Sequence, residues 1–392
     1  MPSVAVANRD LKHLIERAES ISAEVIDAEA TAVDREGRWP ERGLRALQEA
    51  RLGGLVVPES AGGLGHGLFA VARICETLGR YCASTGLCFG MHCVGTAVIA
   101  AKVTADQQDR YLEPIVRGEH LTTLALSEPG TGSHFYMPEA ALTRLDDHSY
   151  RLTGVKSFVT NGGHADSYVV SATGGETDAP AGHFSCVVVP ASSEGLKWGS
   201  SWDGLGMRGN SSRTMEMDAV RVPQENLLGR EGDQTWYVFQ VVAPYFLVAM
   251  AGTYLGVAEA AFDEAKAHIQ RRQHTHTGRA LAQQPIVQQR LGAMWAQLER
   301  TRQLIYHAAR EGDAGGANAL LALLSAKAEV ADCVVGVVNE AMNLCGGSAY
   351  RSGARLERCL RDGRAADVMA PTTDILRLWT GRALLEQPLL GD

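Results

Sequence analysis

The sequence lacks the features that mark several large classes of protein. Its eight cysteines include no CxxC pair and no spacing typical of a metal site, so we expect no metal and buried, reduced thiols in a cytoplasmic protein. It also lacks a basic cluster, because 37 Lys and Arg are interspersed with 45 Asp and Glu for a net charge of −8. That distribution argues against a nucleic acid as partner.

Long hydrophobic runs are missing as well. The first ten residues, MPSVAVANRD, do not contain the apolar core of a signal peptide. Elsewhere Gly, His or a charge interrupts each apolar stretch before about 18 residues, so we expect no membrane span.

What the chain does contain is a hydrophobic pattern that changes twice. Apolar residues recur at three- and four-residue steps from Leu11 to Ala30, and Thr104 precedes Gln107 in a capping-box pattern, which indicates helices. Short apolar runs bounded by Gly, Pro, Asn and Asp are typical of strands, and they lie at 150–160, 167–171, 186–190 and 214–218. Helical patterns return at 250–272, 288–310, 319–344 and 373–385, with a glycine-rich turn at 312–316.

This order predicts an α+β fold of three domains. We expect an N-terminal helical domain over 1–122, a central antiparallel β domain over 123–232 and a C-terminal helical bundle over 233–392.

The segment from Gly204 to Gly209 fits the GxGxxG pattern of dinucleotide-binding proteins. That motif must follow a strand and open a helix. Here a strand-like run, 213–220, comes after it. We therefore interpret these glycines as a loop of the β domain.

Four segments carry a resemblance to a known family. They are LSEPGTGS at 126–133, KSFVTNG at 156–162, the stretch 206–229 that ends in NLLG, and NLCGG at 343–347 followed by Arg361-Asp362. In this order and at these spacings they resemble the acyl-CoA dehydrogenase superfamily of FAD-dependent flavoproteins. The resemblance extends over nearly the whole chain and implies that family's helical, β and helical domains.

The resemblance also implies a flavin site. A flavin needs hydrogen-bond partners at its pyrimidine edge and near N5, the atom that accepts a hydride. Ser127 and Thr160 match the family residues with those roles, and Phe158 stands where a Trp usually lies beside the ring. Gly132 and Ser133 allow the backbone to approach phosphates. The full set implied to bind the cofactor is Leu126, Ser127, Gly132, Ser133, Phe158, Val159, Thr160, Arg272, Thr275, Asn343, Gly346, Gly347, Thr372 and Asp374.

Part of that set implies an oligomer. In the family, the residues matching Arg272, Gly346 and Gly347 reach the FAD of a neighbouring subunit, and a bidentate guanidinium suits a pyrophosphate. The resemblance thus implies a homodimer or homotetramer.

The pattern breaks at the catalytic base. In the family, a Glu just before Gly-Thr removes the substrate's α-proton. Counting from Gly347 without gaps places that Glu at Ala370, and a second family position falls at Phe246. Neither side chain can take a proton. The nearby groups that could replace it, each with an ordinary structural role as the alternative, are Tyr245, His92 and His134.

Three functions remain open at this point. The first is an FAD-dependent dehydrogenase or oxidase that acts on an acyl thioester of CoA or of a carrier protein and passes electrons to an acceptor flavoprotein. The second is a monooxygenase of the same fold, fed by a flavin reductase and able to use FMN, a branch that the stretch 285–288 resembles. The third is a flavin-binding relative that serves as a partner or scaffold without catalysis.

Overall fold

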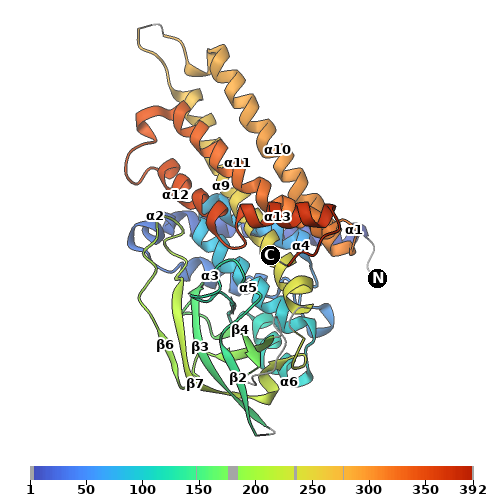
Figure 1. Ribbon diagram of the computed structural model, residues 1–392. Coiled ribbons are helices and arrows are strands. Elements are labelled where there is room, and N and C mark those ends of the chain that lie inside the picture. Colours follow the sequence, from blue (N-terminus) through green and yellow to red (C-terminus); the bar gives the residue numbers. More distant parts are fainter. Residues whose placement is uncertain (1–3, 147, 175–183, 234–235, 277, 391–392) are drawn as a thin grey trace.

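The computed structural model describes residues 4–146, 148–174, 184–233, 236–276 and 278–390. Helices come first along the chain, a twisted sheet follows, and a long helical bundle ends it (Figure 1). The N-terminal helices lie between the sheet and the bundle. The predicted order of helical, β and helical parts is confirmed.

The N-terminal part begins where the sequence pattern predicted helices. Gln107 N–H donates to Thr104 Oγ1 at 3.3 Å and Thr104 N–H donates to Gln107 Oε1 at 3.1 Å, so the predicted capping box is confirmed. A π-turn over Ser22–Ile26 joins the first two helices. The helices of this part are α1 (Val4–Ile21), α2 (Asp27–Glu36), α3 (Glu41–Glu49), α4 (Leu68–Tyr81), α5 (Ala83–Ala101), α6 (Ala105–Gln107) and α7 (Glu113–Arg117).

The central sheet contains all four of the runs predicted as strands. Its order is β6-β7-β3-β2-β4-β5-β8, and β1 pairs with β4. The strands are β1 (Thr122–Ala125), β2 (Ala141–Asp146), β3 (Ser149–Val159), β4 (Ser167–Gly174), β5 (Phe184–Pro190), β6 (Leu196–Trp198), β7 (Arg213–Pro223) and β8 (Leu227–Leu228).

The predicted antiparallel pairing holds for most neighbouring strands of the sheet, but two pairs are parallel. Both β1 and β2 run parallel to β4, and the other pairs are antiparallel. Parallel strands need a crossover connection rather than a tight turn. Here β2 and β3 form part of the connection between β1 and β4, so a mixed sheet results.

The C-terminal part is a bundle of long helices. A π-helical stretch, Tyr237–Val242, runs directly into the first of them. The helices are α9 (Ala243–Arg271), α10 (Pro285–Ala314), α11 (Ala319–Cys345), α12 (Arg355–Val368) and α13 (Thr373–Leu384). The turn predicted at 312–316 begins later than expected, because α10 continues to Ala314. The next residue, Gly315, has a left-handed φ of 63° and caps the helix.

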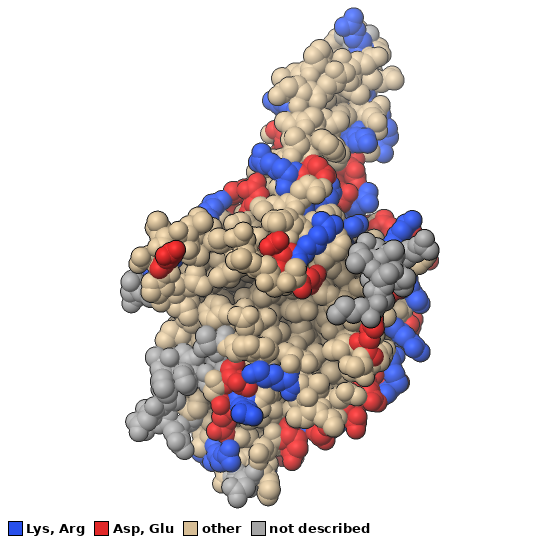
Figure 2. Space-filling view, turned by 90° about the vertical axis from the view of Figure 1, so that its right-hand side faces the viewer, with Lys and Arg blue, Asp and Glu red and all other residues tan. Residues whose placement is uncertain are grey.

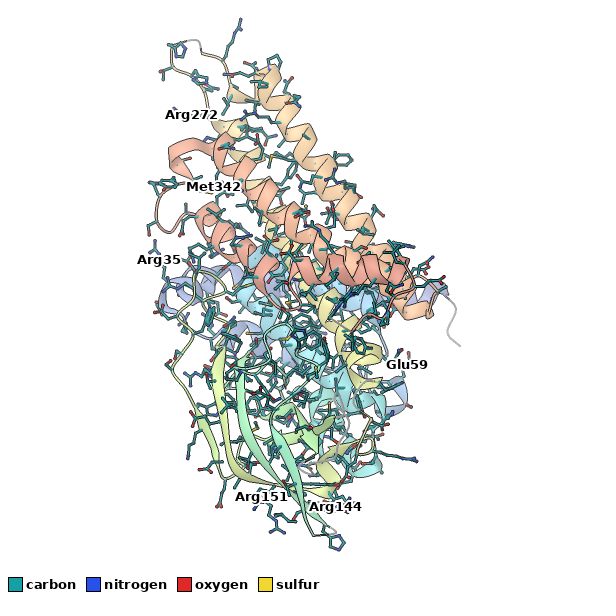
Figure 3. The ribbon with its side chains drawn as sticks, in the orientation of Figure 1. Arg35, Glu59, Arg144, Arg151, Arg272 and Met342 are labelled. Carbon is teal, nitrogen blue, oxygen red and sulfur yellow. The ribbon has the colours of Figure 1, made fainter. Side chains whose placement is uncertain are left out.

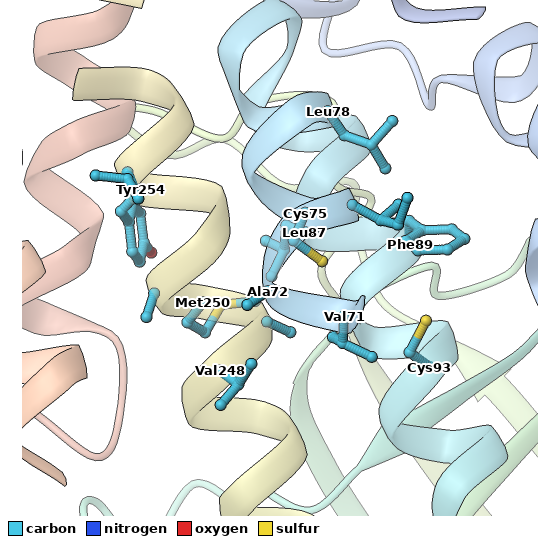
Figure 4. Close-up of a cluster of buried hydrophobic side chains, with 14 of the residues drawn as sticks. Val71, Ala72, Cys75, Leu78, Leu87, Phe89, Cys93, Val248, Met250 and Tyr254 are labelled. Carbon is cyan, nitrogen blue, oxygen red and sulfur yellow. The ribbon is translucent and has the colours of Figure 1, made fainter. Parts of the chain in front are cut away.

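The core lies where α4 and α5 pack against α9 (Figure 4). Two glycines allow α4 and α9 to approach closely: a Cβ on Gly79 would stand 2.2 Å from the Thr253 carbonyl oxygen, and one on Gly252 would stand 2.4 Å from that of Ala72. All eight cysteines are buried and unpaired, as predicted.

Two helices have longer apolar stretches than the sequence analysis predicted. Ala83–Ala101 and Tyr237–Arg271 are long and apolar enough to cross a membrane by composition alone. Within the protein, however, 94% and 78% of their most apolar windows are buried. Their apolar character is that of core helices.

Candidate active site

A cavity of about 860 Å³ opens where the three parts of the chain meet. The sheet contributes the loops after β1 and β3, and a third loop precedes β7. The helices contribute the start of α9, the end of α12 and parts of α5, α11 and α13. The cavity therefore depends on all three parts and is not built within any one of them.

One wall of the cavity is polar. Ser127 and Thr160 both line it, as the resemblance implied. The Ser157 amide donates to the Ser127 carbonyl at 2.7 Å, which ties the loop after β1 to the end of β3. Thr160 Oγ1 lies 3.4 Å from Ser212 Oγ, a lining residue that the sequence reading missed. Ser212 could have been found only from its position after the GxGxxG-like loop.

An aromatic ring stands open on the same wall. Phe158 has a φ of 54° and is 65% exposed. Its ring meets Trp202 edge-on, with the centroids 6.0 Å apart. Trp202 also lines the cavity and was not predicted; its Nε1–H donates to the Gly206 carbonyl at 3.0 Å. A bulky residue with left-handed φ and an uncovered ring is unusual and indicates a functional position.

The GxGxxG-like segment forms another part of the wall. It leads into β7 and not into a helix, so its interpretation as a β-domain loop is confirmed. A Cβ on Gly206 would stand 2.3 Å from the Arg361 carbonyl oxygen. The Met207 amide donates to Asp362 Oδ1 at 2.7 Å, and burial raises the pKa of Asp362 to about 6. The loop and the Arg361-Asp362 pair thus hold each other in place.

A second, apolar part of the lining, here called the apolar wall, comes mainly from the helices, with Phe135 from the loop after β1 and Leu389 from beyond α13. Ala370 and Phe246, the two positions at which the resemblance implies a base, both line this wall, and neither has an ionisable group. The other apolar side chains on this wall are Phe135, Phe239, Val242, Leu247, Leu320, Leu324, Met369, Trp379 and Leu389. The cavity is thus divided into a hydroxyl-rich wall and an apolar wall.

Free carboxylates are missing from the described part of this lining. Its charged side chains are Glu128, Arg361 and Arg364. Glu128 pairs with the buried ammonium of Lys156 and accepts the amides of Glu139 at 2.5 Å and Ala140 at 3.2 Å. Both oxygens of this carboxylate therefore already accept hydrogen bonds from within the protein.

The three substitute bases lie outside the cavity lining. His92 is buried: its Nδ1 lies 3.2 Å from the Thr122 amide and its Nε2 lies 3.0 Å from the Gly53 carbonyl, and burial lowers its pKa to about 4. Burial raises the pKa of Tyr245 to about 12. His134 is exposed in the loop after β1.

The remaining predicted residues separate into two groups. Leu126, Gly132, Ser133 and Thr372 line the cavity, whereas Val159 is buried in the sheet opposite Arg213. The second group is exposed and does not line it: Arg272, Thr275, Asn343, Gly346, Gly347 and Asp374.

Most of this second group lies at the far end of the bundle. Figure 3 places Arg272 at the tip formed by α9 and α10, away from the sheet loops. No acidic residue occurs between Glu264 and Glu299, and Figure 2 shows charges of both signs on the body with Lys and Arg at this tip.

Each of the three parts of the chain matches a known protein domain. The chain matches the acyl-CoA dehydrogenase N-terminal domain over residues 8–119, the middle domain over 123–220 and the C-terminal domain over 236–385. Cyclohex-1-ene-1-carbonyl-CoA dehydrogenase of Geobacter metallireducens is 31% identical, over 96% of this chain and 100% of the relative.

Two further proteins are similar over most of their length. Isovaleryl-CoA dehydrogenase of Arabidopsis thaliana is 29% identical over 88% of this chain and 83% of its own. The structure of butyryl-CoA dehydrogenase from Megasphaera elsdenii has a TM-score of 0.89 at 26% identity, and the match covers 96% of this chain and 98% of that one.

Proposed function

The chain belongs to the acyl-CoA dehydrogenase family of oxidoreductases, and from this premise we propose that it binds FAD in the cavity and oxidises an acyl thioester of CoA or of a carrier protein. The observation that carries the proposal is the division of the cavity into a hydroxyl-rich wall and an apolar wall. A flavin needs polar partners and a flat apolar contact. An acyl chain needs an apolar pocket.

The residues on the polar wall fit a flavin. Phe158 presents an uncovered ring, and the hydroxyls of Ser127 and Thr160 are available to the cavity. Gly132 has a φ of 52°, and no atom lies within 4 Å of the place where its Cβ would stand. That space suits close approach of a phosphate to the backbone. FAD, when bound, supplies the acceptor for a hydride.

The apolar wall fits the acyl part of the substrate, and it excludes water from the reacting end. It offers no group to take the α-proton, because Ala370 and Phe246 occupy the two base positions. We therefore expect slow oxidation of simple saturated acyl-CoAs. The same absence favours, as a second candidate, a monooxygenase that receives reduced flavin and needs no carboxylate at this point.

The proposal also assigns a role to the residues at the tip of the bundle. Arg272, Thr275, Asn343, Gly346 and Gly347 do not line the cavity of their own chain. We propose that they reach the FAD of a second copy in a homodimer or homotetramer. An acceptor flavoprotein would then reoxidise the flavin, in the cytoplasm.

The test is anaerobic mixing of the purified, FAD-loaded protein with a series of acyl-CoAs. Bleaching of the flavin absorbance supports acyl oxidation. Oxygen incorporation into substrate by the reduced protein, without anaerobic bleaching, supports the monooxygenase. Firm FAD binding with neither outcome leaves a non-catalytic flavoprotein, and a colourless monomer that fails to bind FAD in titration overturns the proposal.

A further inference from the structure

A buried lysine lies directly behind the apolar wall. Lys327 is on α11 and has 0% exposure. Its Nζ donates to the carbonyl oxygens of Ala366 at 2.7 Å, Met369 at 3.0 Å and Pro371 at 2.9 Å. An ammonium has three N–H donors, so each of them has a backbone partner.

Two of these partners, the carbonyls of Ala366 and Met369, lie at the end of α12. The helix runs to Val368, and the last carbonyls of a helix accept no hydrogen bond from an N–H of the same helix. A cation at that end also complements the helix dipole. Through Pro371 the same ammonium ties the segment beyond the helix to α11, so one side chain fixes three points of a six-residue stretch.

Among the residues that the structure describes, no carboxylate forms a hydrogen bond or an ion pair with Lys327. Burial lowers the pKa of its ammonium to about 8, and the nearby charge of Asp367 opposes that change. Burying an ammonium is costly unless its hydrogen bonds are made. The three carbonyls therefore have to stay in place as a set, because losing one leaves a buried donor unpaired.

The segment that Lys327 holds is the part of the wall where the family carries its base. Met369, Ala370 and Pro371 all line the cavity. From α9, the Tyr254 hydroxyl lies 3.7 Å from the sulfur of Met369, a second contact from behind. We propose that Lys327 is a positioning residue that fixes Met369, Ala370 and Pro371 and so sets the shape of the reacting end of the cavity.

The inference rests on the proposed function, and its test separates positioning from ordinary core stability. Lys327→Met keeps the length of the side chain and removes all three donors. Val338→Ala is the matched control, because Val338 is equally buried on α11 and lies about 16 Å further along the helix. Lys327→Gln retains two donors and serves if the Met variant does not fold.

Two measurements on the FAD-loaded protein test whether Lys327 has this positioning role. Binding of butyryl-CoA, followed by the flavin spectrum, is expected to weaken about tenfold or more in Lys327→Met at unchanged FAD content, since small displacements near reacting atoms have large effects. Amide hydrogen exchange over residues 366–373 is expected to speed up in that variant. Val338→Ala should change neither the butyryl-CoA affinity nor the exchange rate, even if it lowers the melting temperature as much as Lys327→Met does.

Equal butyryl-CoA affinity and equal exchange in the two variants would overturn the positioning role. If the wild-type protein does not bind butyryl-CoA, the proposed function is at fault in that respect, and the exchange measurement alone decides the role of Lys327.

Discussion

Glu128 and Lys156 form an ion pair directly beside the cavity, with 2% and 0% of their side chains exposed. Each comes from one of the motifs that carry the family resemblance, so the pair joins the loop after β1 to β3. Lys156 also donates to the Leu126 carbonyl at 3.1 Å and to Ser171 Oγ at 3.0 Å. The pair therefore anchors the proposed flavin-binding loop.

This arrangement predicts a specific pattern of stability. Lys156→Met leaves the Glu128 carboxylate buried without its cation, which should lower the free energy of unfolding by about 3–5 kcal/mol. Adding Glu128→Gln to that variant removes the stranded charge and should restore most of the loss. Urea denaturation of the two single variants and the double variant measures this. A double variant as unstable as the sum of the singles would contradict the coupling.

The sequence was sufficient for the order of the three parts of the fold and for several loop residues that line the cavity, because the signals that predict them are local. Thr104, the strand-like runs and the loop motifs act through short-range geometry that a pattern of residues can reveal. The parallel pairing of β1 and β2 with β4 could not be predicted, because it depends on a crossover between distant segments. Trp202, Ser212 and Lys327 were missed for the same reason, because only tertiary contacts bring Trp202 and Ser212 to the cavity and Lys327 to the segment behind its wall.

A second prediction concerns the hydroxyl of Thr160. Thr160→Val removes one polar group from the cavity wall and keeps the shape of the side chain, and one hydrogen bond contributes about 1 kcal/mol. We expect a shifted flavin absorbance spectrum and reduction potential with little loss of stability. Thr96→Val is the control, since Thr96 is fully buried in α5 and its hydroxyl has no partner. A Thr160→Val protein with wild-type flavin properties would remove Thr160 from the site.

The missing base gives a third prediction. Wild-type turnover of butyryl-CoA should fall well below the ordinary enzyme rate of about 10 per second. Ala370→Glu places a carboxylate on the apolar wall and should raise that rate about 10²-fold, the lower end for a general base, since Pro371 restricts its backbone. Ala370→Gln has nearly the same size without basicity and should give no gain. Stopped-flow bleaching of the flavin measures each rate.

A fourth prediction tests the residues at the tip of the bundle. If Arg272 serves the FAD of a second copy, Arg272→Ala should weaken FAD binding about tenfold while the protein stays folded. Arg300→Ala is the control, because Arg300 is an exposed arginine of α10 that pairs with Glu329. Titration with FAD gives the affinities, and light scattering gives the oligomeric state. Equal FAD affinity in the two variants would remove Arg272 from the cofactor site.

The last prediction follows from the buried ring of His92. Burial lowers its pKa to about 4, whereas a free histidine titrates near 6.5. Between these values the unfolded chain binds more protons than the folded one, so the free energy of unfolding falls as the pH drops through this window. His92 alone accounts for a loss of up to about 3 kcal/mol.

The comparison with His92→Gln isolates that contribution. Glutamine can still donate to the Gly53 carbonyl but does not titrate, so its stability curve should be flatter below pH 6.5. Asp362 has a raised pKa and acts in the opposite direction between about pH 4 and 6, but it is present in both proteins and cancels in their difference. Urea midpoints measured at half-unit steps from pH 4.5 to 7.5 give the two curves. Parallel curves would mean that the pKa of His92 is the same in the folded and the unfolded protein, and that result would also reopen its candidacy as a base.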